Sequence, residues 1–143
     1  MVVLKKLQRL SKSPEEYINI TEEVHKLVEE SGVKNGLAFV LTAHTTTGIM
    51  VNEALPCVEK DISEMLEKVV PVDAPYVHAH FLPDYGATGN NSQGHLKSML
   101  MGNHCAFPVI DGKIVCGGAQ EIYLVDFDGP QRRTVYVEIM GEA

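Results

Sequence analysis

Apolar residues in the last third of the chain recur at every second position. Residues 134–139 alternate strictly, so that Val135, Val137 and Ile139 share one side of an extended chain. This alternation predicts a strand with one buried face. Shorter apolar or alternating runs, bounded by turn residues, predict further strands at residues 2–10, 37–41, 49–53, 105–110, 113–116 and 121–127.

A second pattern, in which apolar residues recur every three to four positions, predicts helices. Apolar side chains at positions 58, 62, 65, 66 and 69 fall on one helical face, Pro56 suits the first turn, and Pro71 ends the pattern. A shorter helix is predicted from Thr21, an N-cap residue type, to the turn before Gly32. A third is predicted over residues 94–101.

Turn residues separate these elements and set the fold class. Ser13-Pro14 predicts a turn over residues 11–17, and Asp111-Gly112 predicts a hairpin. Residues 73–93 show no period and predict a long ordered loop of the kind that often carries function. Consecutive hairpins with about three interspersed helices predict an α+β fold, with a mainly antiparallel sheet and flanking helices in one domain over residues 1–143.

Composition narrows the classes of function. The net charge is −7, which disfavours nucleic-acid and anionic membrane surfaces as partners because both require a basic face. The first ten residues lack the unbroken apolar stretch of a signal peptide, and no window resembles a membrane span. Three widely spaced cysteines, Cys57, Cys105 and Cys116, indicate a reduced chain, so we expect a cytoplasmic protein.

Polar residues cluster where the predicted strands break. His44 opens a run of three threonines and a glycine, which suits either a metal ligand or general base beside hydroxyl donors, or a histidine with only a structural role. Asn52 and Glu53 end the next strand. They suit either a base with an orienting amide or an ordinary turn into a helix.

Two further histidine segments carry candidate chemistry. His78 and His80, two residues apart, share one face if their segment is extended. His95 and Lys97 begin the predicted helix over residues 94–101, where free N–H groups and the helix dipole favour an anion, although residues two apart on a helix diverge. The residue types allow one metal to be bound by His44, His78 and His95.

The last hairpin carries several charged residues around an Asp-Gly-Pro turn. Asp126 and Asp128 precede or form the turn, and Arg132 and Arg133 follow it. Such charges are commonly solvated, but an arginine here is also suited to clamping a phosphate. Gln120 lies before the preceding strand.

Taken in order, these motifs resemble the YjbQ-like family, whose members carry the label secondary thiamine-phosphate synthase. The resemblance rests on elements spread over nearly the whole chain. They are His44-Thr45-Thr46, Asn52-Glu53, Tyr76-x-His78, His95-Leu96-Lys97, Pro108-Val109-x-Asp111-Gly112 and Phe127-Asp128-Gly129-Pro130.

The resemblance implies a sandwich-like α+β fold, a homotrimer, and a pocket for a phosphorylated small molecule. The implied reaction joins a pyrimidine pyrophosphate to a thiazole phosphate and releases pyrophosphate, with a divalent metal, Mg²⁺ or Zn²⁺, as cofactor. Expected catalytic residues are His44, Asn52, Glu53 and His95, and expected substrate-binding residues are Thr45, Thr46, Lys97, Gln120 and Arg133. The expected metal ligands are His44, His78 and His95.

The chain also departs from the family pattern. A glycine-threonine-tryptophan-glutamine run is here Gly117-Gly118-Ala119-Gln120, and the first arginine after the Asp-Gly-Pro turn is here Gln131. Losing a bulky aromatic side chain should reshape any pocket that it lined. Two alternatives to an enzyme therefore stay open: a binding module for a metal or phosphorylated ligand without turnover, and an oligomer whose buried polar residues hold subunits together.

Overall fold

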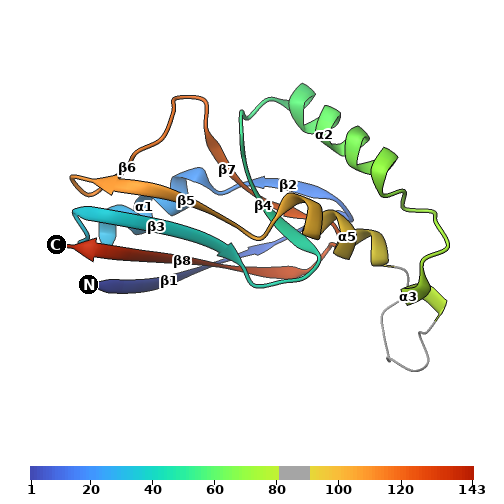
Figure 1. Cartoon of the computed structure of the whole chain (residues 1–143), viewed down its shortest axis with the longest axis horizontal. Coiled ribbons are helices and arrows are strands. Elements are labelled where there is room, and N and C mark those ends of the chain that lie inside the picture. Colours follow the sequence, from blue (N-terminus) through green and yellow to red (C-terminus); the bar gives the residue numbers. More distant parts are fainter. Residues whose placement is uncertain (81–90) are drawn as a thin grey trace.

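The computed structural model describes residues 1–80 and 91–143, and it consists of two antiparallel sheets with helices packed on and beside them (Figure 1). Every strand pair is antiparallel. Sheet A has the order β1-β8-β3-β5-β6, and sheet B has the order β2-β7-β4. The predicted α+β class is therefore confirmed. The strands are β1 (Val2–Leu10), β2 (Glu16–Asn19), β3 (Asn35–Thr42), β4 (Thr47–Asn52), β5 (His104–Ile110), β6 (Lys113–Ile114), β7 (Glu121–Asp126) and β8 (Arg132–Glu142).

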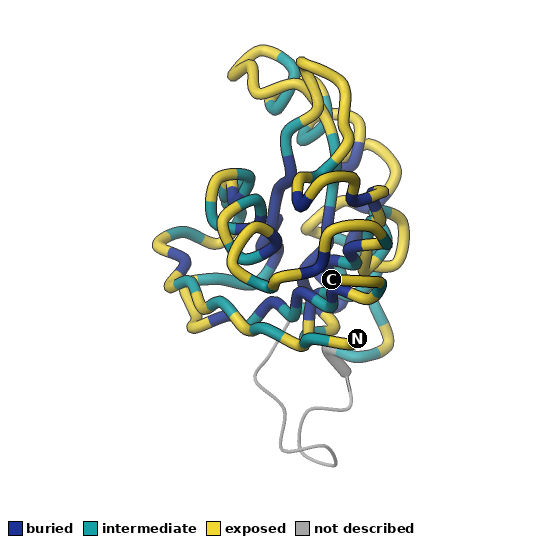
Figure 2. The backbone as a smooth tube through the Cα atoms, turned by 90° about the vertical axis from the view of Figure 1, so that its left-hand side faces the viewer, coloured by how far each residue is buried: buried dark blue, intermediate teal, exposed yellow. Residues whose placement is uncertain are grey.

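The main core fills the space between the two sheets. In β8 the alternating residues Val135, Val137 and Ile139 are fully buried, as their rhythm predicts. They face Ile49 and Leu124 of sheet B in the same cluster. The buried stretches of the backbone gather in the interior in Figure 2, while exposed residues lie at the periphery.

The three predicted helices are present and take different positions. Helix α1 (Thr21–Glu30) buries Val24 and Val28 in the main core. Helix α2 (Pro56–Val69) lies at the margin of the molecule, where Leu66 packs with Tyr123 in a smaller cluster (Figure 1). Helix α5 (Ser92–Met101) packs on β4.

Some boundaries differ from those that the sequence predicts. The turn predicted over residues 11–17 ends earlier, because β2 begins at Glu16 and pairs with the centrally placed β7. The loop predicted over residues 73–93 contains a short helix, α3 (Val77–His80), and the first two residues of α5. Strand β2 is set by its pairing with β7, and α3, with four residues, is too short to show a helical period in the sequence.

Across the described ranges, no helix is long and apolar enough to cross a bilayer. The lengths agree with this result, because α2 has 14 residues whereas a spanning helix needs about 20 apolar ones.

Leu124→Ala tests the core between the sheets. Leu124 is fully buried in β7, so the truncation should lower the free energy of unfolding by about 2–5 kcal/mol. Leu55→Ala is the matched control, because Leu55 is 40% exposed and its truncation should cost much less. Urea unfolding of both variants measures the difference. Equal losses would contradict this placement of the core.

Candidate functional site

His44 lies in the connection that carries the chain from sheet A to sheet B. The hydroxyls of Thr42 and Thr47, at the two ends of this connection, are hydrogen-bonded at 2.5 Å. The backbone N–H of Thr134 in β8 donates a hydrogen bond to Nε2 of His44 at 2.8 Å. The connection is thus held at its ends and at its ring, and the imidazole has a defined orientation.

This hydrogen bond fixes the tautomer of neutral His44. Nε2 accepts from a backbone N–H, so the ring proton lies on Nδ1, which is therefore a donor. Burial lowers the pKa of His44 below its ordinary 6.5, the positive charge of Arg133 lowers it further, and Asp126 partly opposes both. His44 is accordingly a neutral hydrogen-bond donor at pH 7.

Two adjoining clefts meet at His44. The first has a volume of about 480 Å³, and its polar lining includes His44, Thr45, Asn91, His95 and Gln131. The second, of about 410 Å³, shares His44, Thr45 and His95 and continues toward Asn103. His44 comes from the β3–β4 connection and His95 from α5, so the fold brings together two histidines that lie far apart in the sequence.

His78 joins this group through His95. The rings of His78 and His95 pack edge to face with their centroids 5.5 Å apart. The condition under which His78 and His80 would share one face, an extended segment, is not met, because both residues belong to the helix α3. Residues two apart on a helix point in different directions, so the helix removes the reason for pairing them. The side chain of His80 lies outside the described part.

The three predicted metal ligands therefore occupy one neighbourhood, but His44 is not arranged as a ligand. Its Nε2 lone pair is used by Thr134 N–H, and Nδ1 carries the proton. Within residues 1–80 and 91–143 no three His, Cys, Asp or Glu side chains are grouped so as to hold a metal ion. The three-histidine site stays a prediction.

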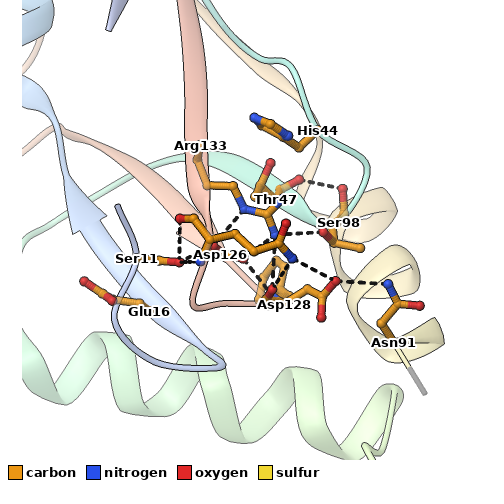
Figure 3. A network of polar contacts seen from close by, with 12 residues as sticks. Ser11, Glu16, His44, Thr47, Asn91, Ser98, Asp126, Asp128 and Arg133 are labelled. Atoms are coloured by element: carbon orange, nitrogen blue, oxygen red, sulfur yellow. Dashed lines mark hydrogen bonds and ion pairs between the residues drawn. The ribbon is translucent and has the colours of Figure 1, made fainter. Parts of the chain in front are cut away.

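Beneath the first cleft lies a buried ion pair between β8 and β7. Arg133 donates to both carboxylate oxygens of Asp126, from Nε and from one terminal nitrogen, at 2.8 Å each. The same terminal nitrogen donates to Thr46 Oγ1 at 2.9 Å, and Ser11 Oγ donates to Asp126 at 2.6 Å. Figure 3 shows this network below His44. All four residues, Ser11, Thr46, Asp126 and Arg133, are at most 5% exposed.

The partners of Asp126 decide its ionisation. Burial alone raises the pKa of this carboxyl, but the hydrogen bonds from Arg133, Ser11 and the Asp128 N–H outweigh it, and the pKa is lowered below 3.8. Arg133, expected to bind phosphate, thus has its charge largely satisfied within the protein. It still lines the first cleft, together with Asp128.

Lys97 faces away from His95, as two positions on a helix require. It is 1% exposed, and its Nζ lies 3.1 Å from Glu67 and 3.8 Å from Glu15. These contacts join α5 to α2 and to the segment before β2. Lys97 lines neither of the two clefts.

The other predicted site residues lie elsewhere. Asn52 and Glu53 are exposed at the far end of β4, and five residues of strand place Asn52 about 16 Å from Thr47. Gln120 is exposed in the β6–β7 connection, where its side chain accepts a hydrogen bond from Gly117 N–H at 2.7 Å. Within one chain, the described structure does not bring these residues to His44.

Two site residues had weak sequence signals. Asn91 precedes α5 and donates to Asp128 at 3.0 Å. Ser11, assigned only to a turn, contributes to the Arg133 network. A Ser-Pro turn and a residue before a helix have structural explanations of their own, so only the tertiary contacts show where these side chains lie.

Known proteins share this fold and these motifs. The family model described as UPF0047 protein YjbQ-like matches residues 5–142. The chain belongs to this family. A UPF0047 protein of Methanothermobacter thermautotrophicus is 38% identical over 89% of this chain and 84% of its own length. UPF0047 protein YugU of Bacillus subtilis is 37% identical over 97% of this chain and 100% of its own.

Solved structures of the family agree with the fold. A YjbQ-like protein of unknown function from Sulfolobus solfataricus has a TM-score of 0.89 at 31% identity, covering 99% of each chain. An uncharacterised protein from Clostridium acetobutylicum has a TM-score of 0.85 at 38% identity, covering 95% of this UPF0047 chain and 99% of its own. None of these names assigns a reaction.

Arg133→Met tests the buried pair. It leaves the Asp126 carboxylate buried without its cation, which should lower the free energy of unfolding by about 3–5 kcal/mol at pH 7. Arg132→Met, an exposed neighbour, is the control.

The loss in Arg133→Met should depend on pH. The lowered pKa of Asp126 stabilises the native chain above about pH 4, and this contribution disappears as pH falls through the folded pKa. The difference between the two proteins should therefore shrink on acidification, as measured by urea unfolding at several pH values. A constant difference would contradict the assignment.

His44 should titrate below 6.5 and carry its neutral proton on Nδ1, which ¹⁵N-detected imidazole spectra can measure. Protonation turns Nε2 into a donor and breaks the bond from Thr134. The stability that depends on neutral His44 is therefore present above pH 6.5 and lost as pH falls through the folded pKa. Observation of the Nε2–H tautomer would exclude this geometry.

Proposed function

We propose that the cleft at His44 binds a phosphorylated small molecule and that the protein is an enzyme acting on it. One observation carries the proposal: Thr134 N–H holds His44 as a neutral Nδ1–H donor on a polar cleft that it shares with His95. Because a backbone N–H binds one ring nitrogen, the ring is fixed in orientation and its other nitrogen is available to contact a ligand. Preorganised donors of this kind stabilise negative charge on phosphoryl or carbonyl oxygens.

Neutral donors, rather than net charge, are suited to recognise the ligand. Arg133 lies at the cleft but is paired with Asp126, and Asp128 adds a further carboxylate to the lining. Thr45, Asn91 and Gln131 supply hydroxyl and amide groups. A phosphate bound here therefore needs a cation of its own, which agrees with the divalent metal that the family resemblance implies.

Oxygen atoms fit this cation better than the histidines do. Among the described residues, Asn91 Oδ1 is buried without a hydrogen-bond partner, and its amide nitrogen bonds the Asp128 carboxylate. Mg²⁺ prefers carboxylate and carbonyl oxygens and commonly binds together with substrate phosphates. Asp128 and Asn91 would hold it, and a bound Mg²⁺ would neutralise a pyrophosphate leaving group.

His95 is suited to proton transfer. It lines both clefts on the side formed by α5, and histidine is the side chain that most often serves as a general acid or base. His44 would then hold an oxygen of the substrate while His95 gives or takes a proton. A condensation that releases pyrophosphate, of the thiamine-phosphate synthase type, is the reaction that the resemblance favours. A cytoplasmic homotrimer stays part of this proposal.

A second candidate is a binding module without turnover. It is favoured by the use of the His44 lone pair by Thr134 N–H, which prevents His44 from acting as a base. The two candidates share the ligand class and differ in whether product forms.

His44→Ala and His95→Ala should each weaken binding of a phosphorylated ligand at least about tenfold, the loss of one good hydrogen bond to a charged group. Calorimetry with thiazole phosphate, pyrimidine pyrophosphate and pyrophosphate, with and without Mg²⁺, measures this. Lys97→Met and His25→Ala are controls, because neither residue lines the clefts.

The outcomes separate the candidates. Product formed by the native chain and lost with His95→Ala supports the enzyme, whereas binding without product supports the module. Equal affinity in the native chain and both histidine variants would refute the site. A loss of ligand affinity in Lys97→Met alone would indicate that Lys97, rather than the two histidines, binds the phosphate.

A further inference from the structure

Helix α5 is held at two places by one stretch of chain, the arm formed by α2, residues 70–76 and α3. His95 and Lys97 lie two positions apart on α5 and therefore point in different directions. The ring of His78 in α3 packs on His95 with the centroids 5.5 Å apart. Glu67, near the end of α2, lies 3.1 Å from Lys97 Nζ. Figure 1 shows the chain running from α2 to α3 beside α5.

Polar contacts hold α2 in place more than apolar packing does. Of the residues of α2, all of which the structure describes, Leu66 alone is buried. Glu59, Ser63 and Glu67 follow one another at intervals of four residues and so share one side of the helix. Their hydrogen bonds are those of Tyr123 to Glu59 at 2.7 Å, of Ser63 to Glu15, and of Lys97 to Glu67. The position of the arm therefore depends on these directional contacts.

The contact between Lys97 and Glu67 ties the arm to α5. The side chain of Lys97 is 2% exposed, and a buried ammonium group is costly unless a carboxylate stays beside it. Glu15 also lies near Lys97, but at 3.8 Å, whereas Glu67 lies within hydrogen-bonding distance. Glu67 is therefore held close to α5, although about half of its own side chain is exposed.

Glu67 also fixes the connection that leads from α2 to α3. One of its carboxylate oxygens accepts from Val72 N–H at 2.8 Å, and the other accepts from Lys97. The hydrogen bond from Val72 lowers the pKa of Glu67 below its ordinary 4.5, burial opposes this, and Lys97 lowers the pKa further, so Glu67 is ionised at pH 7. Tyr76 OH then donates to the main-chain oxygen of Pro71. A series of contacts thus runs from α5 through Glu67 to the residue that precedes α3.

We propose that Glu67 is a positioning residue, which holds the arm so that the ring of His78 stays packed on His95. This inference rests on the proposed function, in which His95 transfers a proton. His78 lines neither cleft, so the arm acts on His95 rather than on the ligand. A second ring against an imidazole restricts its orientation, and proton transfer depends on orientation. Glu67 therefore affects turnover more than ligand affinity.

Glu67→Gln tests this role. The amide has one oxygen acceptor in place of two and no charge, so it cannot serve both partners, while Glu15 keeps Lys97 paired. In protein labelled at histidine, nuclear Overhauser contacts between the rings of His78 and His95 should be present in the native chain and lost in the variant. Product formation should fall about tenfold, with the affinity for thiazole phosphate within about twofold of the native value.

A second variant and a control separate positioning from general stability. Lys97→Met removes the other member of the pair and leaves Glu67 half-exposed to water, so it should cause the same loss of ring contact with an intact fold by circular dichroism. Glu64→Gln makes the same chemical change at an exposed glutamate of the same helix. It should alter neither the ring contact nor turnover.

Persistence of the contact between His78 and His95 in Glu67→Gln, or an equal loss in Glu64→Gln, would overturn the proposal. So would unchanged turnover after the ring contact is lost, because the contact would then have no part in the reaction. A native chain that forms no product would refute the proposed enzyme instead. In that case the ring contact alone decides the role of Glu67, which its loss in both variants supports and its persistence refutes.

Discussion

The buried Arg133–Asp126 pair joins the parts of the molecule on which the candidate site depends. Arg133 belongs to β8 of sheet A and Asp126 to β7 of sheet B, so their two hydrogen bonds link the sheets directly. Ser11, after β1, and Thr46, before β4, complete the network. Removing two charges from water costs several kcal/mol, and only such complete hydrogen bonding offsets that cost. The candidate site therefore lies directly above a buried and fully hydrogen-bonded network that joins the two sheets.

The same buried network also affects the charge state of His44 in the cleft above it. Arg133 lies close enough to His44 to favour the neutral imidazole, and the next residue, Thr134, supplies the N–H that selects its tautomer. Two consecutive residues of β8 thus control the charge and the orientation of His44. A protonated His44 would lose the hydrogen bond from Thr134 and face the like charge of Arg133, so strand β8 itself favours the neutral imidazole.

The sequence predicted the parts of this structure that depend on local patterns. Alternation over residues 134–139 identified β8 and its buried face, and the three helices followed from their periodicity and end residues. The divergence of His95 and Lys97 also followed from helix geometry. Tertiary partners could not be predicted. The position of Lys97 near a helix N-terminus suggested an anion site, but its side chain is buried between two glutamates. Helix α3 is too short to show a helical period.

The two departures from the family pattern have unequal consequences. Gly118 and Ala119, in place of threonine and tryptophan, lie in the exposed β6–β7 connection and line neither cleft at His44. Gln131, in place of an arginine, lines the first cleft and donates to the main-chain oxygen of Asp128 at 2.7 Å. The charge of Arg133 is already neutralised by Asp126. An arginine at position 131 would therefore be better placed than Arg133 to pair with a phosphate. If the cleft binds a phosphorylated ligand as proposed, the amide at position 131 would make binding depend more on a cation that enters with the ligand, and Gln131 rather than the missing tryptophan is the departure that would change the ligand preference.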